Sequence, residues 1–222
     1  PEHVYKAALK EIAQLRNRDR DYKRALKVVL ILAYRTGMRR NEILHLQLRD
    51  IERSEDRTIF VRANSLGRLK TSAARRNIPT TALLLTSEAK IYDAYCRSRQ
   101  VGRPSSTDLL FCIAGKPKQP LDGHQVTNNV KRILWKAGAS GVLHDFRHTA
   151  LSRLQLVAER EWILVRRFSA YTEEQATAIY REVFGHPKSA ATRYWALAAF
   201  AGHSSPMTTF ASYLHFSSML LY

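Results

Sequence analysis

Apolar residues near the start of the chain recur with the spacing of an amphipathic helix. They are Leu26, Val29, Leu30, Ala33 and Tyr34. Residues three, four and seven positions apart share one helical face, so we predict a helix over residues 21–35. Gly37 follows and can end this helix in a left-handed conformation. Apolar residues within 40–48 predict a second short helix, which places Arg39 at the junction of two helices.

The pattern changes after the second helix. Short runs at 50–52, 58–62 and 76–79 are separated by polar, turn-forming segments around 54–56 and 64–74. Such alternation is typical of short strands joined by turns, and it predicts three strands.

Helical spacing returns in the rest of the chain. The predicted helices are 82–98, 122–137, 144–157 and, with weaker periodicity, 172–183 and 189–200. Asp122 is expected to cap the N-terminus of its helix. The polar segments 101–108 and 114–120 are rich in Gly and Pro and predict surface loops. No internal repeat or break in composition divides the chain, which favours one mainly helical domain.

The charge of the chain indicates the kind of partner it binds. Its 222 residues include 36 Lys and Arg against 19 Asp and Glu, a formal net charge of +17. Such an excess favours a polyanion such as nucleic acid. A basic ribosomal-type protein, or a soluble protein without such a partner, fits the same composition. The longest apolar segment, 28–34, is far shorter than the roughly 18 residues of a membrane span.

The two cysteines, Cys96 and Cys112, form neither a zinc pattern nor a disulfide framework. This favours a reducing, cytoplasmic compartment. The N-terminal residues include no initiator Met and do not resemble a signal peptide. We therefore expect the chain to be a fragment that lacks an N-terminal portion.

Arg39 and Arg147 stand out among the basic residues because each lies among polar groups beside an apolar helix. Reaction at a phosphodiester develops negative charge on the non-bridging oxygens, and a catalyst without a metal needs fixed cations there. Arginine is always charged and can bind phosphate through two N–H groups. The alternative is that both are solvated surface residues, which is the usual position of arginine.

His144 lies three residues before Arg147, so the two share one face of a helix. An imidazole and a guanidinium could then serve one phosphate. One alternative is a capping or surface histidine. Another is a metal pair with His148, for which Asp145 would be the nearby additional ligand.

Tyr213 is one of ten tyrosines, a residue type that is mostly used for packing. Its hydroxyl could act as a nucleophile, although forming the phenolate at pH 7 costs about 4 kcal/mol from a pKa near 10. Neighbouring arginines and a base would lower this cost. A nucleophilic tyrosine is therefore expected in a cationic pocket, with Tyr194 as a second candidate.

Four segments resemble, in order, the motifs of the tyrosine recombinase (phage integrase) family. Residues 36–46 resemble its first arginine box, with Glu42 at the helix start, and residues 69–79 its lysine-bearing β-hairpin. Residues 144–149 resemble its His-x-x-Arg box, and residues 202–215 the end of its catalytic domain. The site residues that the resemblance identifies are Arg39, Lys70, His144, Arg147, His203 and Tyr213.

The resemblance, which spans residues 21–216, implies a mainly helical catalytic domain with a small three-stranded antiparallel sheet. The domain would occupy residues 1–222, with the family's N-terminal DNA-binding domain missing. The interval between Arg147 and His203 is longer than is usual in the family. An inserted helical element is therefore expected within 158–190.

The family's reaction implies a role for each site residue. Tyr213 would attack the scissile phosphate, form a 3′-phosphotyrosine and release a 5′-hydroxyl. The implied supporting roles are stabilisation of the pentavalent phosphate by Arg39, Arg147 and His203, protonation of the leaving oxygen by Lys70, and assistance to tyrosine deprotonation by His144. The resemblance implies no cofactor and no metal.

The sequence thus predicts a cytoplasmic, DNA-associated recombinase that acts on double-stranded DNA, as in integration or excision of a mobile element. The apolar tail, residues 214–222, favours docking onto a neighbouring protomer and hence a tetramer on DNA, although it could instead fold back onto its own domain. Two other functions share these features: DNA relaxation by a type IB topoisomerase-like monomer, and DNA binding without catalysis.

Overall fold

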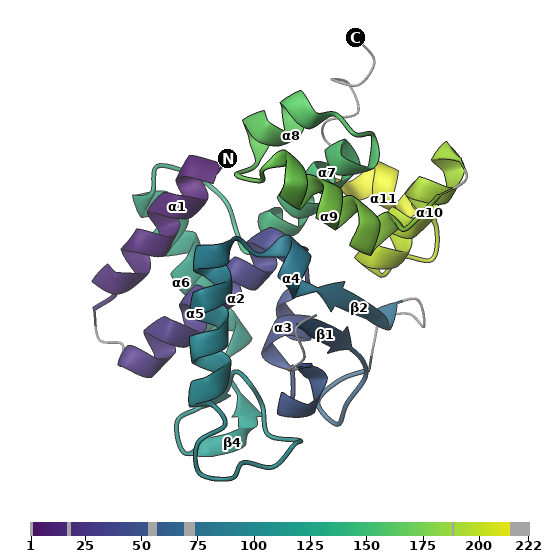
Figure 1. Cartoon of the computed structure of the whole chain (residues 1–222). Helices are drawn as coiled ribbons and strands as arrows, with labels where there is room; N and C mark the ends of the chain where they lie inside the picture. The colour runs from purple at the N-terminus through teal and green to yellow at the C-terminus, as the bar shows by residue number, and fades with distance from the viewer. Residues whose placement is uncertain (1, 17–18, 53–56, 69–73, 188, 214–222) are drawn as a thin grey trace.

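A computed structural model describes residues 2–16, 19–52, 57–68, 74–187 and 189–213, with the backbone alone for 211–213. The protein is mainly helical (Figure 1). Its α-helices are α1 (Glu2–Glu11), α2 (Arg20–Thr36), α3 (Arg40–Leu44), α4 (Thr80–Leu83), α5 (Thr86–Ser98), α6 (Gly123–Lys136), α7 (Asp145–Ala158), α8 (Trp162–Phe168), α9 (Glu173–Phe184), α10 (Ala190–Ala201) and α11 (Pro206–Tyr213). The strands are β1 (Thr58–Val61), β2 (Arg76–Pro79), β3 (Cys112–Ile113) and β4 (Lys116–Pro120), and short 3₁₀ turns lie at Ile12–Gln14 and Leu48–Asp50.

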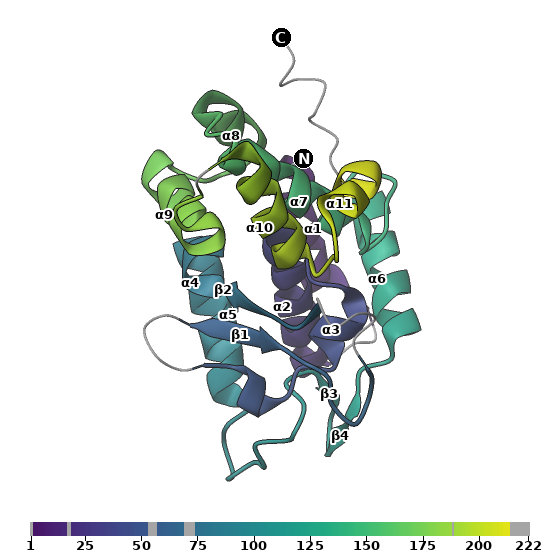
Figure 2. The ribbon, with the colours of Figure 1, turned by 90° about the vertical axis from the view of Figure 1, so that its right-hand side faces the viewer.

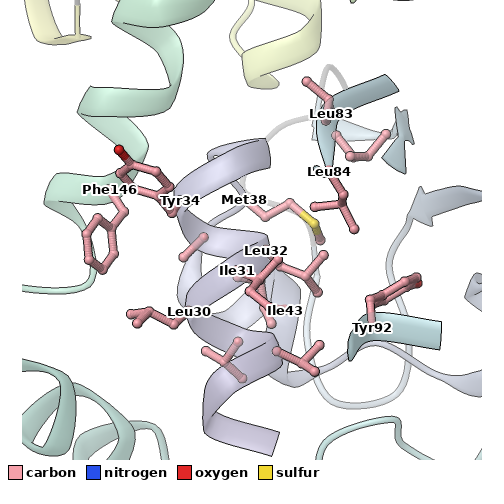
Figure 3. Packing of buried hydrophobic residues seen from close by; sticks show 14 of the residues in the cluster. Leu30, Ile31, Leu32, Tyr34, Met38, Ile43, Leu83, Leu84, Tyr92 and Phe146 are labelled. Carbon is pink, nitrogen blue, oxygen red and sulfur yellow. The ribbon is translucent and has the colours of Figure 1, made fainter. Parts of the chain in front are cut away.

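Helix α2 forms the centre of the core. Every residue from 28 to 36 is buried, whichever side of the helix it occupies. A helix that is apolar all round must be enclosed by other elements, and here α5 and α7 pack along it. Figure 3 shows Leu30, Ile31 and Leu32 of α2 among apolar side chains from several other segments. None of the helices in the described part of the chain is long and apolar enough to cross a membrane.

The helix predictions with the clearest end signals are confirmed. Helix α2 starts at the cap Asp19, whose carboxylate accepts a hydrogen bond from the backbone N–H of Tyr22 at 2.6 Å. It ends at Gly37, which has a left-handed φ of 67°. Helix α6 starts after Asp122, which accepts from the N–H of Gln125 at 2.9 Å. The predicted short helix after Arg39 is also present, but it ends at Leu44.

The expected three-stranded sheet is not observed in the part of the chain that the structure describes. That part contains two separate two-stranded antiparallel sheets, β1 with β2 and β3 with β4. The segment predicted as a first strand makes only one bridge, between Ile51 and Ile59. It cannot extend because Asp50 belongs to a 3₁₀ turn, where its carboxylate accepts from the N–H of Gln47 at 2.8 Å and from Arg62.

Other boundaries differ where the local pattern was weak. The predicted helix 82–98 is divided into α4 and α5, and the predicted loop 114–120 contains most of the β3–β4 hairpin. Helices α1 and α11 were not predicted, and α8 lies within the region 158–190 that was expected to contain an inserted helical element. The weakly periodic segments 172–183 and 189–200 do form helices α9 and α10.

A buried ion-pair network attaches α1 to the core. The guanidinium of Arg35 in α2 is enclosed between the carboxylates of Glu2 and Glu88, with closest contacts of 2.7 and 2.9 Å. Two tyrosines complete the carboxylates' hydrogen bonds: Tyr34 donates to Glu2 at 3.0 Å and Tyr5 to Glu88 at 2.8 Å. A buried charge is tolerated only when it is paired and hydrogen-bonded in this way.

Two features favour glycine at position 37: its backbone conformation and the close approach of α7. Its φ is left-handed, and an added Cβ would lie 3.2 Å from the Cβ of Ala150 on α7. Gly138, at the end of α6, has a similar φ of 81° but open space around it. Gly138→Ala should therefore cost about 1 kcal/mol of stability from backbone strain alone. Gly37→Ala should cost measurably more, because α7 must also shift. Urea denaturation of the two variants measures this difference, and equal losses would mean that the α2–α7 contact is not tight.

Candidate active site

The first arginine box lies where α2 gives way to α3. Gly37 turns the chain out of α2, and Arg39 occupies the N-cap position of α3. The side chain of Arg39 is 24% exposed and donates from Nη1 to Glu42 Oε1 at 2.8 Å. The backbone N–H of Arg39 donates to the other carboxylate oxygen of Glu42, also at 2.8 Å. The arginine is thus held at the start of a helix and remains accessible.

Glu42 is shared between two arginines. Besides the two bonds from Arg39, it accepts a pair from Arg76, from Nη1 to Oε1 at 3.1 Å and from Nη2 to Oε2 at 2.8 Å. Burial opposes ionisation of this carboxyl, but the hydrogen bonds and charges of Arg76 and Arg39 prevail and lower its pKa to about 2. Glu42 is therefore a fixed anion between two cations at neutral pH.

Arg147 is buried and is held by the ends of two helices. Its Nη1 donates to the carbonyl of Gly37, at the end of α2, at 2.6 Å. Its Nη2 donates to the carbonyl of Ala201, the last residue of α10, at 2.5 Å. Helix C-termini carry partial negative charge and present unpaired carbonyls, so they suit a cation. The fold thereby positions a permanent positive charge where α2, α7 and α10 meet.

His203 contacts Arg147 and α11. Gly202 ends α10 in a left-handed conformation, and the next residue places its imidazole Nε2 3.1 Å from Arg147 Nη2. Since a guanidinium can only donate, we assign Nε2 as the acceptor and Nδ1–H as the donor to Thr209 Oγ1, at 2.8 Å. Burial, followed by the charges of Arg147, Arg39 and Arg76, lowers the pKa of His203 to about 4. The imidazole is therefore neutral at pH 7.

His144 lies at the edge of this group. It is exposed and immediately precedes α7, and its ring stacks edge-on to that of His148 at 5.1 Å. Partial burial of the imidazole and the charge of Arg147 lower the pKa of His144. Among the described residues, no group of three or more His, Cys, Asp or Glu could hold a metal ion, so the alternative of a metal pair gains no support.

Two hollows flank Arg39. One, of about 330 Å³, is also lined by His144 and by Thr127 of α6. The other, of about 200 Å³, includes Arg62 and Arg68. Arginines thus line both hollows, together with the carboxylates of Glu42 and Asp50 in the second. Figure 2 shows the end of α10, the start of β2 and α3 lying close together.

The two remaining predicted residues lie at or beyond the limits of the description. Lys70 falls outside the described residues. Tyr213 is the last residue of α11, one helical turn after Thr209, and its backbone alone is described. For the second candidate, Tyr194, burial and a hydrogen bond to Glu159 raise the pKa to about 12, which disfavours the phenolate form.

Sequence reasoning missed two members of this group, Arg76 and Thr209. Both are buried. Arg76 occupies an inward position of β2, in register with buried Ile78 two residues later. An arginine at an inward strand position is unusual, and this alternation could have identified it. For Thr209 the sequence offered no comparable signal beyond its place after His203.

The depressed pKa of His203 predicts a loss of stability in acid. The native imidazole titrates at about 4, against an ordinary value of 6.5, so only the unfolded chain takes up this proton as the pH falls between these values. Stability should fall across that window, by up to about 3 kcal/mol from this residue. Urea denaturation from about pH 7.5 to pH 4 should show a shallower loss in His203→Gln. Replacing the exposed His186 with Gln is the control, and a wild-type slope in His203→Gln would contradict the prediction.

Comparison with known proteins identifies the family and the fold of the chain. The model of the phage integrase family matches residues 2–186. Among solved structures, the XerA recombinase is similar with a TM-score of 0.61 and 17% identity, over all of this chain and 60% of that one.

The XerH site-specific recombinase, bound to a palindromic difH substrate in a post-cleavage complex, is similar with a TM-score of 0.60 and 19% identity, over 98% of this chain and 49% of that one. The chain therefore spans between half and 60% of the length of these structures, and the likeness at this identity concerns the fold. A search of curated protein sequences found no significant match. Because the family model covers most of its length, the chain belongs to the phage integrase family of tyrosine recombinases.

Proposed function

We propose that this chain is the DNA-cleaving and rejoining part of a site-specific tyrosine recombinase that serves integration or excision of a mobile element. The observation that carries the proposal is the convergence of Arg39, Arg147 and His203 from three helix ends. These groups are held by hydrogen bonds before any substrate arrives. Preorganised donors of this kind stabilise developing charge without reorganisation during the reaction.

In the proposed reaction, Tyr213 attacks the scissile phosphorus of duplex DNA. The bond from phosphorus to the 5′-oxygen breaks as the bond to the phenolic oxygen forms, giving a 3′-phosphotyrosine and a free 5′-hydroxyl. The phenolic proton leaves with assistance from His144, and Lys70 gives a proton to the departing oxygen. Attack by a 5′-hydroxyl on the phosphotyrosine reverses these steps and rejoins the DNA. The arginines supply the cationic charge, so the proposal needs no metal.

His203 has a specific part in this proposal. In the free protein its Nε2 accepts from Arg147, and the imidazole proton is on Nδ1. To donate to a phosphate oxygen, Nε2 must carry the proton instead. The hydroxyl of Thr209 can donate as well as accept. It can therefore bond Nδ1 in either tautomer, which allows Nε2–H to be presented to the phosphate.

Support for Tyr213 as the nucleophile comes from its position in the chain. It follows Thr209 by one turn of α11, and Thr209 bonds the histidine that contacts Arg147. The region expected to hold an insertion, 158–190, contains α8 and α9, and we propose that these two helices are the inserted element.

Covalent trapping tests the proposal. A library of nicked duplexes with random sequence around the nick would be incubated with the protein, and duplexes attached covalently would be recovered and sequenced. Tyr213→Phe should bind the recovered duplex with unchanged affinity and form no adduct, because it lacks the attacking oxygen. Tyr194→Phe is the matched control and should trap normally.

The outcomes of this experiment separate the alternatives. No adduct from the wild-type chain would favour a DNA-binding protein without catalysis. Adduct formation followed by relaxation of supercoils, with no strand exchange between two duplexes, would favour a topoisomerase-like enzyme. An adduct that persists in Tyr213→Phe would overturn the assignment of the nucleophile.

We also propose that residues 214–222, which lie outside the described residues, dock onto a neighbouring protomer in a tetramer on DNA. This segment is strongly apolar, so it gains from leaving water. Deleting residues 216–222 should weaken assembly on the recovered duplex while one protomer still binds one half-site. Sedimentation with DNA measures both, and Val101→Ser, which removes an exposed apolar side chain elsewhere, is the control. Unchanged assembly would mean that the tail folds onto its own domain.

A further inference from the structure

Arg76 occupies a central position that the proposed reaction does not use. It is the first residue of β2, and its side chain is 6% exposed. The strand follows the segment that contains Lys70, so Arg76 lies at the exit of that segment. A buried guanidinium needs compensation for the water it loses, and the partners that provide it come from three different parts of the candidate site.

The first partner is Glu42. Arg76 binds both of its carboxylate oxygens, at 3.1 and 2.8 Å, in the two-pronged geometry that suits a guanidinium and a carboxylate. The oxygen that accepts from Arg76 Nη1 also accepts from Arg39 Nη1, at 2.8 Å. The position of Arg39 is therefore linked to that of Arg76 through a single oxygen atom.

The other partners are backbone segments. Arg76 Nη1 donates to the carbonyl of Ala74 at 2.9 Å, which fixes the end of the segment after Lys70. On the other side, Gly202 packs directly on the guanidinium, since a Cβ at this glycine would lie 3.0 Å from Arg76 Nη1. The residue after Gly202 is His203. One guanidinium thus contacts the Arg39 helix, the exit of the lysine segment and the turn that carries His203.

We propose that Arg76 is a positioning residue that sets the relative places of Arg39 and the turn that carries His203. The inference rests on the proposed function, because it assigns Arg76 a part in DNA cleavage. A buried Arg–Glu pair with a purely structural role would stabilise the fold without affecting the reacting groups. The shared oxygen of Glu42 and the contact with Gly202 distinguish Arg76, since each leads directly to a group that would contact the phosphate.

The proposal predicts that geometry matters more than charge at this position. Lysine keeps the charge but cannot bind both oxygens of Glu42 while also contacting Ala74 and Gly202. A displacement of about 1 Å at a catalytic group can cost about 100-fold in rate. Arg76→Gln should therefore slow single-turnover cleavage by about 100-fold, and Arg76→Lys should remain at least about tenfold slower than the wild type.

A double-variant comparison tests the route through Glu42. If Arg76 acts by holding this carboxylate, Arg76→Gln with Glu42→Gln should be no slower than the slower single variant. The assay is single-turnover adduct formation on the recovered duplex, with DNA affinity and thermal unfolding measured in parallel. Arg193→Gln, which removes the ion pair of Arg193 with Glu159, is the control and should cleave at the wild-type rate.

The results separate this inference from the proposed function. Wild-type cleavage in Arg76→Gln or Arg76→Lys, or losses that multiply in the double variant, would overturn the positioning role and leave the recombinase proposal intact. If the wild type forms no adduct, hydrogen exchange of the Arg39 side-chain N–H groups, followed by NMR in the free protein, decides the inference. Arg76→Gln should then accelerate that exchange, and unchanged exchange would overturn the inference.

Discussion

The structure depends on a cation enclosed by helix ends. Arg147 is buried, and the carbonyls that bind it belong to the ends of α2 and α10. Removing a guanidinium from water costs several kcal/mol unless its donors are satisfied. Only a fold that brings these two helix ends to the start of α7 provides that compensation. The same interaction therefore stabilises the helical packing and fixes the charge that the proposed chemistry requires.

The two glycines that end these helices explain how such a close approach is possible. Gly37 and Gly202 both adopt left-handed conformations, and each has another chain segment within van der Waals distance where a side chain would begin. Each helix can therefore end abruptly, with a carbonyl at its end that accepts a hydrogen bond from Arg147. Two guanidinium groups, those of Arg39 and Arg76, then share one carboxylate, Glu42. An excess of fixed positive charge is unfavourable in the free protein, and an anionic ligand relieves it.

Part of this architecture could be predicted from the sequence because it is encoded locally. Helices α2 and α6 have clear apolar periodicity, and Asp19, Asp122 and Gly37 mark their ends. Helix α8 could not be predicted in this way, because its seven residues are too few to establish a period. The third strand failed because Asp50 is recruited into a turn by partners that local patterns do not reveal. The resemblance to the family's motifs predicted Arg39, Arg147 and His203, which the fold brings together. The role of Arg76 depends on contacts with residues far along the chain, and no local signal specifies them.

The network around Arg35 also attaches the first helix to the core. Glu2 lies in the first turn of α1 and supplies one of the two carboxylates that compensate this buried charge. Were α1 detached, Arg35 would keep its partner in α5 but lose one of its two carboxylate partners and the hydrogen bonds that this partner provides. Helix α1 is therefore part of the packed core and not a helical linker. It belongs to the same packed unit as α2 and α5 on electrostatic grounds.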